Sequence, residues 1–336
     1  MATIKDVAAR AGVSFTTVSH VVNNTRPVSS DVRVKVEAAI RDLNFVPSAV
    51  ARSLKARTTS TIGVLVPNST NPYFAELSRG IEDYCERHGY CVILGNSDDN
   101  AAKQRKYMRV LIERRIDGLI VASAGDEATL AEALLHIGLP VVIVDREVIG
   151  VEADLVTIDH REGAYMAVRH LLDLGHRRIA CISGLAEMAV GAARVDGFRR
   201  ALREKNVPLK DCPIVESDYT STGGYRAAVG LLEEGRRPSA IFATNDMMGL
   251  GVLRAAAERG ISVPRELSVV GFDDIELCRF FYPALTTVGQ SIVMLGERAA
   301  ETLIERVGKQ YEGPPRRLII APKMTLREST GGPLQG

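Results

Sequence analysis

Hydrophobic and polar residues follow a regular pattern from residue 61 to residue 273. Short apolar runs alternate with longer segments in which apolar residues recur every three or four positions. The runs come in two rounds: TIGVLV, YCVILG, DGLIVA, LPVVIVD and LVTID, then RRIACIS, SAIFAT and LSVVGFD. The segments between them predict helices that begin at Pro72 and near Glu162 and that cover 103–114 and 127–135. Apolar strands between amphipathic helices are typical of parallel sheets covered on both faces, so the pattern predicts two similar α/β lobes with doubly wound parallel sheets.

The N-terminal residues carry a helical pattern and no strand pattern. Gly12 ends a first helix, Ser14 can cap a second helix over 15–22, and a third follows Ser29 and Ser30. The apolar positions are Ile4, Val7, Ala8 and Ala11 in the first helix and Val32, Val36, Ala39, Ile40 and Leu43 in the third. This arrangement predicts a helix-turn-helix head with a supporting helix. The alternative is a small helical bundle with a solvated basic face.

Residues 47–58, PSAVARSLKART, also have a helical pattern, but the segment is too short to be helical alone in water. Its Leu54 stands among Arg52, Lys55 and Arg57 and has no obvious core to enter. The segment is therefore either a flexible linker between domains or a helix that forms only against a partner.

Charge separates the head from the rest of the chain. The net charge of the whole chain is +1, but residues 1–57 hold nine Lys or Arg against four Asp or Glu, which leaves an acidic remainder. A basic head on an acidic body indicates a polyanionic partner for the head alone.

Other features bound the class of protein. No apolar stretch is long enough to span a membrane, and the first residues lack the layout of a secretory signal. The five scattered cysteines contain no C-x-x-C pair, which indicates free thiols in a reducing cytosol, so we expect a cytoplasmic protein without a metal site or a cofactor.

Polar residues gather where the predicted strands end. VPNSTNPYF follows the first strand, VDR the fourth, ATND a later one and VGFDD the last of the runs. Ligands of open α/β sheets bind beyond the carboxyl ends of the strands. Carboxylate, guanidinium and amide groups beside aromatic rings suit a small polyhydroxylated ligand, whereas each of these residues taken alone could simply cap a helix.

ATIKDVAARAGVSFTTVSHVVN and the following VPSAVARSLKA resemble the DNA-binding head and hinge of the lactose/galactose repressor family, closest to its ribose and purine branches. The resemblance implies that Thr16 and His20 contact bases in the major groove. It places further DNA contacts at Lys5, Phe15, Thr17, Ser19 and Asn23 in the head and at Ala51, Leu54 and Lys55 in the hinge. Phe15 departs from the small hydroxyl residue of those two branches, so the operator sequence is expected to differ there. In this family the hinge becomes helical on DNA beside its twin, and a leucine is wedged into the minor groove, as expected for Leu54.

Residues 60–330 resemble the two-lobed periplasmic sugar-binding fold that these repressors share. The resemblance to ribose-binding members implies an effector site formed by Asn71, Tyr73, Phe74, Asp145, Arg146, Arg194, Tyr219, Asn245, Asp273 and Gln290. The purine branch has polar residues where this chain has Met188 and Val190, and a tryptophan where it has Arg146. We therefore expect a sugar effector, ribose or a relative of it, with a purine or nucleoside as the alternative.

The resemblance implies a domain plan with a head over 1–46, a hinge over 47–58 and a body over 59–336. The first lobe is expected to take 60–160 and 291–320, and the second 161–290 and the C-terminal segment. The expected partners are a pseudo-palindromic operator, the effector and a second copy of the chain in a homodimer. The last residues, TLRESTGGPLQG, are polar and are expected to be frayed.

Two other classes of function compete with a repressor. An enzyme on the same body, such as a sugar kinase or dehydrogenase, would need a phosphate loop, a nucleophile elbow or a nucleotide fingerprint, and the sequence contains none of these. A plain sugar-binding or transport protein would not need the basic head. The sequence therefore predicts a non-enzymatic repressor controlled by a small molecule.

Overall fold

The computed structural model describes residues 2–23, 26–46, 58–122, 127–135, 137–185, 188–233 and 237–334. The chain divides into two units, Met1–Thr59 and Ser60–Gly336, and each is described by itself. All of the predicted hinge except Thr58 lies outside the described residues, and so do Ala51, Leu54 and Lys55.

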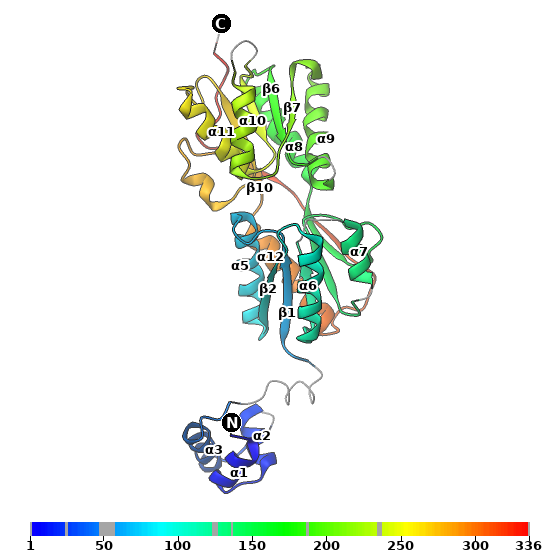
Figure 1. Cartoon of the computed structure of the whole chain (residues 1–336), viewed down its shortest axis with the longest axis vertical. Coiled ribbons are helices and arrows are strands. Elements are labelled where there is room, and N and C mark those ends of the chain that lie inside the picture. The colour runs from blue at the N-terminus through cyan, green and yellow to red at the C-terminus, as the bar shows by residue number, and fades with distance from the viewer. Residues whose placement is uncertain are drawn as a thin grey trace. The chain divides into compact units, whose positions relative to one another are not determined.

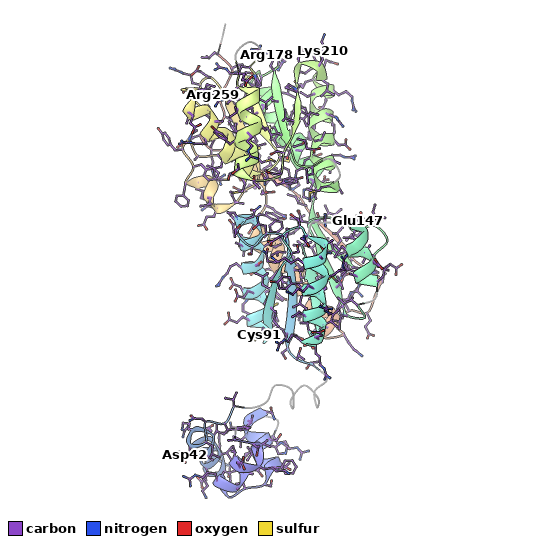
Figure 2. The ribbon with its side chains drawn as sticks, viewed as in Figure 1. Asp42, Cys91, Glu147, Arg178, Lys210 and Arg259 are labelled. Carbon is purple, nitrogen blue, oxygen red and sulfur yellow. The ribbon has the colours of Figure 1, made fainter. Side chains whose placement is uncertain are left out.

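The described residues of the head form three helices, α1 (Ile4–Ala11), α2 (Phe15–Asn23) and α3 (Ser30–Asp42) (Figure 1). Gly12 ends α1 in the left-handed conformation, with φ of 66°, which glycine adopts without strain. The Ser14 hydroxyl caps α2 by accepting a hydrogen bond from the Thr17 amide at 3.1 Å. The apolar positions predicted for the first and third helices pack into one cluster with Val18 and Val21 of α2. An ion pair of 2.9 Å between Arg10 and Asp42 joins α1 to α3; Asp42 is labelled in Figure 2. The predicted helix-turn-helix head is therefore confirmed.

The body contains two six-stranded sheets, one in each lobe. The first sheet is parallel throughout and has the strand order β11 (Arg317–Ile320), β5 (Asp154–Ile158), β4 (Val141–Val144), β3 (Gly118–Val121), β1 (Thr61–Val66) and β2 (Cys91–Asn96). The second has the order β12 (Lys323–Thr325), β10 (Thr286–Gly289), β9 (Ser268–Asp273), β8 (Ala240–Ala243), β6 (Ile179–Ser183) and β7 (Ile214–Glu216). In the second sheet the edge strand β12 runs antiparallel to β10, and the other strands are parallel.

Helices cover the sheets of both lobes (Figure 1). In the first lobe they are α5 (Pro72–Arg87), α6 (Ala101–Glu113), α7 (Glu127–Leu135) and α12 (Ile292–Val307). In the second lobe they are α8 (His160–Asp173), α9 (Ala189–Glu204), α10 (Ser221–Leu231) and α11 (Asp246–Glu258), with short 3₁₀ turns η1 (Leu209–Asp211) and η2 (Glu276–Arg279). The helices pack chiefly as the pairs α5 with α12, α8 with α9 and α10 with α11. The predicted fold class, two doubly wound lobes, is confirmed.

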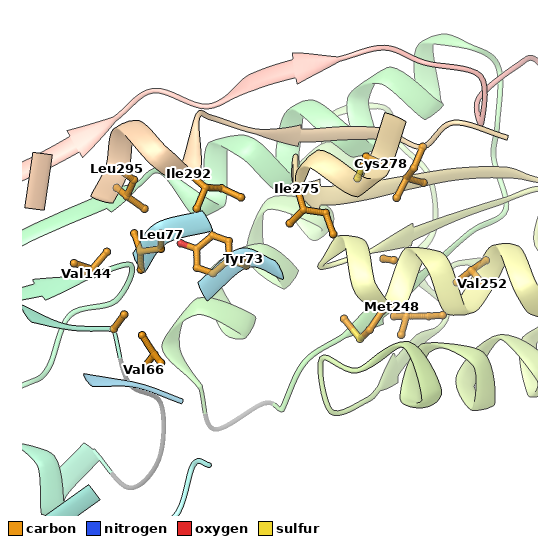
Figure 3. Close-up of a cluster of buried hydrophobic side chains, with 14 of the residues drawn as sticks. Val66, Tyr73, Leu77, Val144, Met248, Val252, Ile275, Cys278, Ile292 and Leu295 are labelled. Carbon is orange, nitrogen blue, oxygen red and sulfur yellow. The ribbon is translucent and has the colours of Figure 1, made fainter. Parts of the chain in front are cut away.

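The chain crosses between the lobes three times, from β5 to α8, from β10 to α12 and from β11 to β12. One continuous apolar cluster also extends through both lobes (Figure 3). It includes Tyr73, Leu77 and Ile292 of the first lobe and Ile275 and Met248 of the second. Each crossing places the start of the next element beside the carboxyl ends of strands, where the predicted ligand residues lie.

The expectation of a frayed C-terminal segment is wrong for residues 326–334. Ser329 is fully buried, and its backbone carbonyl accepts a hydrogen bond of 2.8 Å from the Val269 amide. The Gly331 carbonyl lies 2.8 Å from Nε2 of His176. The segment is polar because its hydroxyl and backbone groups serve as hydrogen-bond partners for the edge of the second lobe.

Two glycines of α10 have different surroundings: Gly224 packs against the backbone of α11, and Gly230 does not. A Cβ on Gly224 would lie 2.4 Å from the Met248 carbonyl oxygen of α11, whereas a Cβ on Gly230 would meet no atom within 4 Å. We expect Gly224→Ala to lower the free energy of unfolding by about 1–3 kcal/mol, since the helix backbones must separate. The matched control Gly230→Ala should be neutral or should raise it by about 0.5–1 kcal/mol, because alanine favours helix. Urea denaturation measures both, and equal effects would show that this helix contact does not require glycine.

Candidate functional site

The exposed face of α2 presents part of the predicted DNA-binding set. Phe15 is 60% exposed, and Thr16 and Asn23 are exposed as well; Lys5, also exposed, belongs to α1. The hydroxyls of two other predicted residues are engaged within the helix. Thr17 Oγ1 lies 2.8 Å from Ser14 Oγ, and Ser19 Oγ lies 3.2 Å from Nδ2 of Asn23. His20 is half-buried at the same face.

A cavity of about 600 Å³ lies between the two lobes of the body. Its lining comes from strand ends and helix starts of both lobes and comprises Pro67, Asn68, Asn71, Tyr73, Phe74, Asp99, Ala122, Asp145, Arg146, Leu185, Met188, Val190, Arg194, Asp218, Tyr219, Thr220, Asn245 and Asp273. Nine of the ten predicted effector residues are therefore brought together. The tenth, Gln290, follows β10 and is not among the lining residues.

Asp145 is the central acceptor on the first-lobe side of the cavity. Tyr73 donates its hydroxyl to Oδ1 of Asp145 at 3.0 Å, and Nε2 of His160 lies 3.3 Å from the same oxygen. Burial by itself raises the pKa of Asp145, but His160, Arg194 and the Tyr73 hydroxyl outweigh burial and lower the pKa to about 2. The carboxylate is therefore ionised and presents a negative charge to the cavity.

Arg194 is the central donor on the second-lobe side and is 3% exposed. Its Nη2 donates to Oδ1 of Asp273 at 3.1 Å, its Nη1 donates to the Thr244 carbonyl, and its guanidinium stacks on the Phe272 ring at 3.8 Å. Burial, together with the negative charges of Asp246 and Asp145, raises the pKa of Asp273 well above its usual range, although the guanidinium opposes this. The charge of Arg194 thus acts on two part-buried carboxyl groups, Asp273 by direct contact and Asp145 through space, and of the two Asp145 is ionised.

Three lining residues have backbone conformations that are rare for residues other than glycine. The φ angles are 74° at Asp145, 61° at Tyr219 and 114° at Asp273. Asn245 stabilises the conformation of Tyr219, because its Nδ2 donates to the Tyr219 carbonyl at 2.9 Å. Its Oδ1 accepts from the Met248 amide and caps α11. Such strain persists only where the surroundings enforce it, and it is common at ligand sites.

Of two buried acid–base residues beside the cavity, sequence reasoning missed His160 and named Asp246 only as a polar residue of the ATND strand end, without a role. His160 opens α8 and is 8% exposed. Asp246 is fully buried and accepts from the Thr287 hydroxyl at 2.5 Å and the Ile275 amide at 3.0 Å, and burial raises its pKa to about 7. The available signal was position, because each residue follows a strand end directly after a residue that caps the next helix, Asp159 for α8 and Asn245 for α11.

No group of three or more histidine, cysteine or acidic side chains among the described residues could hold a metal ion. No helix in that part of the chain is both long enough and apolar enough to cross a bilayer. All five cysteines are free thiols, and Cys91 is the exposed one (Figure 2).

A helix-turn-helix head on a two-lobed body with a polar cavity defines a DNA-binding regulator with a small-molecule site. Comparison with known proteins agrees with this class. The model for bacterial regulatory proteins of the lacI family matches residues 3–48, and that for a periplasmic binding protein-like domain matches 168–330. The repressor PurR of Vibrio vulnificus is 43% identical over 330 residues, which cover 98% of each chain, and PurR of Glaesserella parasuis is 41% identical over 335 residues.

Solved structures give the same result. The lac repressor dimer bound to operator and an anti-inducer is 28% identical, with a TM-score of 0.87 over 98% of this chain and 99% of that one. A LacI family regulator from Enterococcus faecium with bound ribose is 32% identical, with a TM-score of 0.74 over 82% of this chain and all of that one. The chain therefore belongs to the lacI family of bacterial regulatory proteins. It is a DNA-binding transcriptional repressor and not an enzyme.

The Tyr73 hydroxyl gives a test of the buried cluster. We expect Tyr73→Phe to lower the free energy of unfolding at neutral pH by about 1–2 kcal/mol, because a buried carboxylate loses a donor. The pKa of Asp145 lies below its ordinary value, so the stability it contributes is present above about pH 4 and is lost as the pH falls toward 2. The difference between wild type and variant should therefore shrink in acid.

The matched control is Tyr225→Phe, which removes a similar hydroxyl–carboxylate contact, to Glu258, at the surface. Its effect should be small at every pH, because water replaces the lost donor. Urea denaturation from pH 2 to pH 7 measures both variants. Equal losses from the two substitutions would contradict the assigned role of the buried pair.

Proposed function

We propose that this repressor binds a pseudo-palindromic operator as a homodimer in the cytoplasm and that a small molecule between its lobes sets the operator affinity. Two heads would occupy the half-sites, with the hinges over 47–58 paired as helices at the centre. The exposed face of α2 supports the first part, and the cavity supports the second. The solved lac repressor relative, a dimer on operator DNA, supports the assembly.

The charge of the cavity lining favours an uncharged effector. The lining holds four carboxyl groups against two guanidinium groups, with the acids Asp99, Asp145, Asp218 and Asp273 and the bases Arg146 and Arg194. Because Asp273 has a raised pKa, it can hold a proton, yet the lining stays negative without its charge. A phosphorylated sugar or a nucleotide would meet net repulsion there.

The arrangement of polar groups in the cavity supports a sugar best. Carboxylates and guanidiniums that face each other can bind neighbouring hydroxyls two at a time, and Tyr73 and Phe74 provide ring faces. Met188 and Val190, on the second-lobe side, have no donor or acceptor for the polar edge of a base. This chemistry and the ribose-bound relative both support ribose or a related pentose as the proposed effector.

A purine is the second candidate, and overall likeness favours it. The relatives that match over the full length at 41–44% identity are named as the purine repressor PurR, and the ribose-bound structure is less similar. Full-length similarity thus favours the alternative over the sugar expected from the sequence, while the composition of the cavity favours the sugar. A direct titration separates the two candidates.

Calorimetric titration of the whole chain with D-ribose and, separately, with hypoxanthine tests the effector. We expect ribose to bind and Arg146→Ala to weaken that binding by at least roughly tenfold, equivalent to about 1.4 kcal/mol. The matched control, Arg254→Ala, alters an arginine of α11 that is paired with Glu258 outside the cavity, and it should bind like wild type. Binding of hypoxanthine alone would establish the purine candidate, and binding of neither would refute both.

Operator binding by Leu54→Ala tests the proposed wedge. We expect the affinity to fall roughly tenfold and the DNA bend to decrease, because alanine cannot separate the central base pairs. Fluorescence anisotropy with a fluorescent operator measures the affinity at two salt concentrations, and effector affinity should be unchanged. Leu326→Ala, at a leucine of the body that is 63% exposed, is the control. Unchanged affinity and bend in Leu54→Ala would remove the wedge.

A further inference from the structure

One histidine lies at a junction between the two lobes and beside the cavity. β5 ends at Ile158 in the first sheet, and α8 of the second lobe begins at His160, so the chain changes lobe within two residues. The imidazole is 8% exposed. Its two ring nitrogens face opposite sides of this junction, and the partners on both sides line the cavity.

The contacts toward the first lobe are made by Nε2. This nitrogen lies 2.8 Å from the carbonyl oxygen of Asp145 and 3.3 Å from Oδ1 of its carboxylate. The Thr157 hydroxyl donates to the same carbonyl oxygen at 2.6 Å. The Asp145 carboxylate also accepts from Tyr73, so Asp145 is fixed from two elements of the first lobe and from His160.

The contacts toward the second lobe are made by Nδ1. This nitrogen lies 3.4 Å from Nε and 3.3 Å from Nη2 of Arg194, whose Nη2 also donates to Asp273. A guanidinium has donors and no acceptor, so Nδ1 must be the acceptor in this contact. The proton of the ring is then on Nε2, which donates to the Asp145 carbonyl, and the imidazole links the two lobes in a single tautomer.

We propose that His160 is the positioning residue that couples effector occupancy to the arrangement of the lobes. The inference rests on the proposed function. An effector that binds Asp145 on one side and Arg194 or Asp273 on the other uses residues that His160 also links. His160 contacts Asp145 and Arg194 directly, and it reaches Asp273 through Arg194. A shift of one lobe against the other must then move Arg194 relative to Asp145 or break a hydrogen bond of the imidazole. Effector binding and movement of the lobes therefore act on the same buried chain of hydrogen bonds. An effector can favour one lobe arrangement only through contacts that differ between the two arrangements, and this chain provides them.

The test compares operator affinity of the whole chain with and without saturating D-ribose, or hypoxanthine if that is what the wild type binds. The ratio of the two affinities measures coupling, and calorimetry measures effector affinity separately. We expect His160→Leu to bring the ratio to within twofold of one while effector affinity changes less than tenfold. His160→Leu should also leave operator affinity without effector measurable, which shows that the head is intact.

Two polar variants and one control give the test its specificity. His160→Gln can donate near the Nε2 position and should retain part of the coupling, whereas His160→Asn is too short to reach the Asp145 carbonyl and should lose it. If His160→Leu fails to fold, the test is that His160→Gln retains more of the coupling than His160→Asn. The matched control is His170→Gln on the same helix, because His170 contacts Thr330 of the C-terminal segment, and its ratio should equal that of wild type.

Three outcomes would overturn the inference. A wild-type ratio in His160→Leu, or equal ratios in the Gln and Asn variants, would show that coupling does not pass through this residue. Loss of effector binding itself in His160→Leu would make His160 a binding residue. A wild-type chain that responds to neither compound would overturn the proposed function and this inference with it, and it is recognised from the wild type alone.

Discussion

The body depends on one buried guanidinium that compensates two carboxyl groups. Removing charges from water costs several kcal/mol per ion unless each is paired and hydrogen-bonded. Arg194 meets this requirement on the second-lobe side through Asp273, the Thr244 carbonyl and the Phe272 ring. Asp145 meets it from the first lobe through Tyr73 and His160. Because His160 of the second lobe contacts both Asp145 and Arg194, the two halves of the cluster are joined at the lobe junction beside the cavity.

The sequence predicted the elements whose pattern is local and strong. Apolar runs such as TIGVLV have only one stable place, the interior of a sheet covered on both faces, and this is where β1 lies. Ser14 acts as the predicted helix cap, and Asn71 likewise caps the helix predicted to begin at Pro72, because a cap depends only on the next two or three residues. The short edge strands β7, β11 and β12 were not predicted. They are partly exposed, so burial leaves little apolar signal in them, and pairing with distant strands fixes them.

The cavity residues were predictable for a topological reason. Parallel strands bring their carboxyl ends to one edge, so polar residues after separate strands converge even when they are far apart in sequence. Asp145 and Asp273 are such residues. Gln290 follows the same rule but lies at a crossing between lobes, where the chain leaves the cavity. His160 was not predicted, and Asp246 was named only as a polar residue at a strand end, because their importance comes from burial and from distant partners such as Arg194 for His160 and Thr287 for Asp246.

The choice of effector is decided by fewer residues than the fold is. Identity of 43% over 330 residues is a property of the whole chain, whereas an effector contacts only the side chains that line the cavity. Function resides in the site that the fold carries, and related folds accept different ligands when a few side chains change. Here Met188 and Val190 place apolar side chains in a lining whose carboxyl groups outnumber its guanidinium groups. A ligand with several hydroxyls and no charge can satisfy both Asp145 and Arg194, whereas likeness to the PurR repressors over the full length favours a purine, so the few side chains of the cavity decide between the two ligand classes.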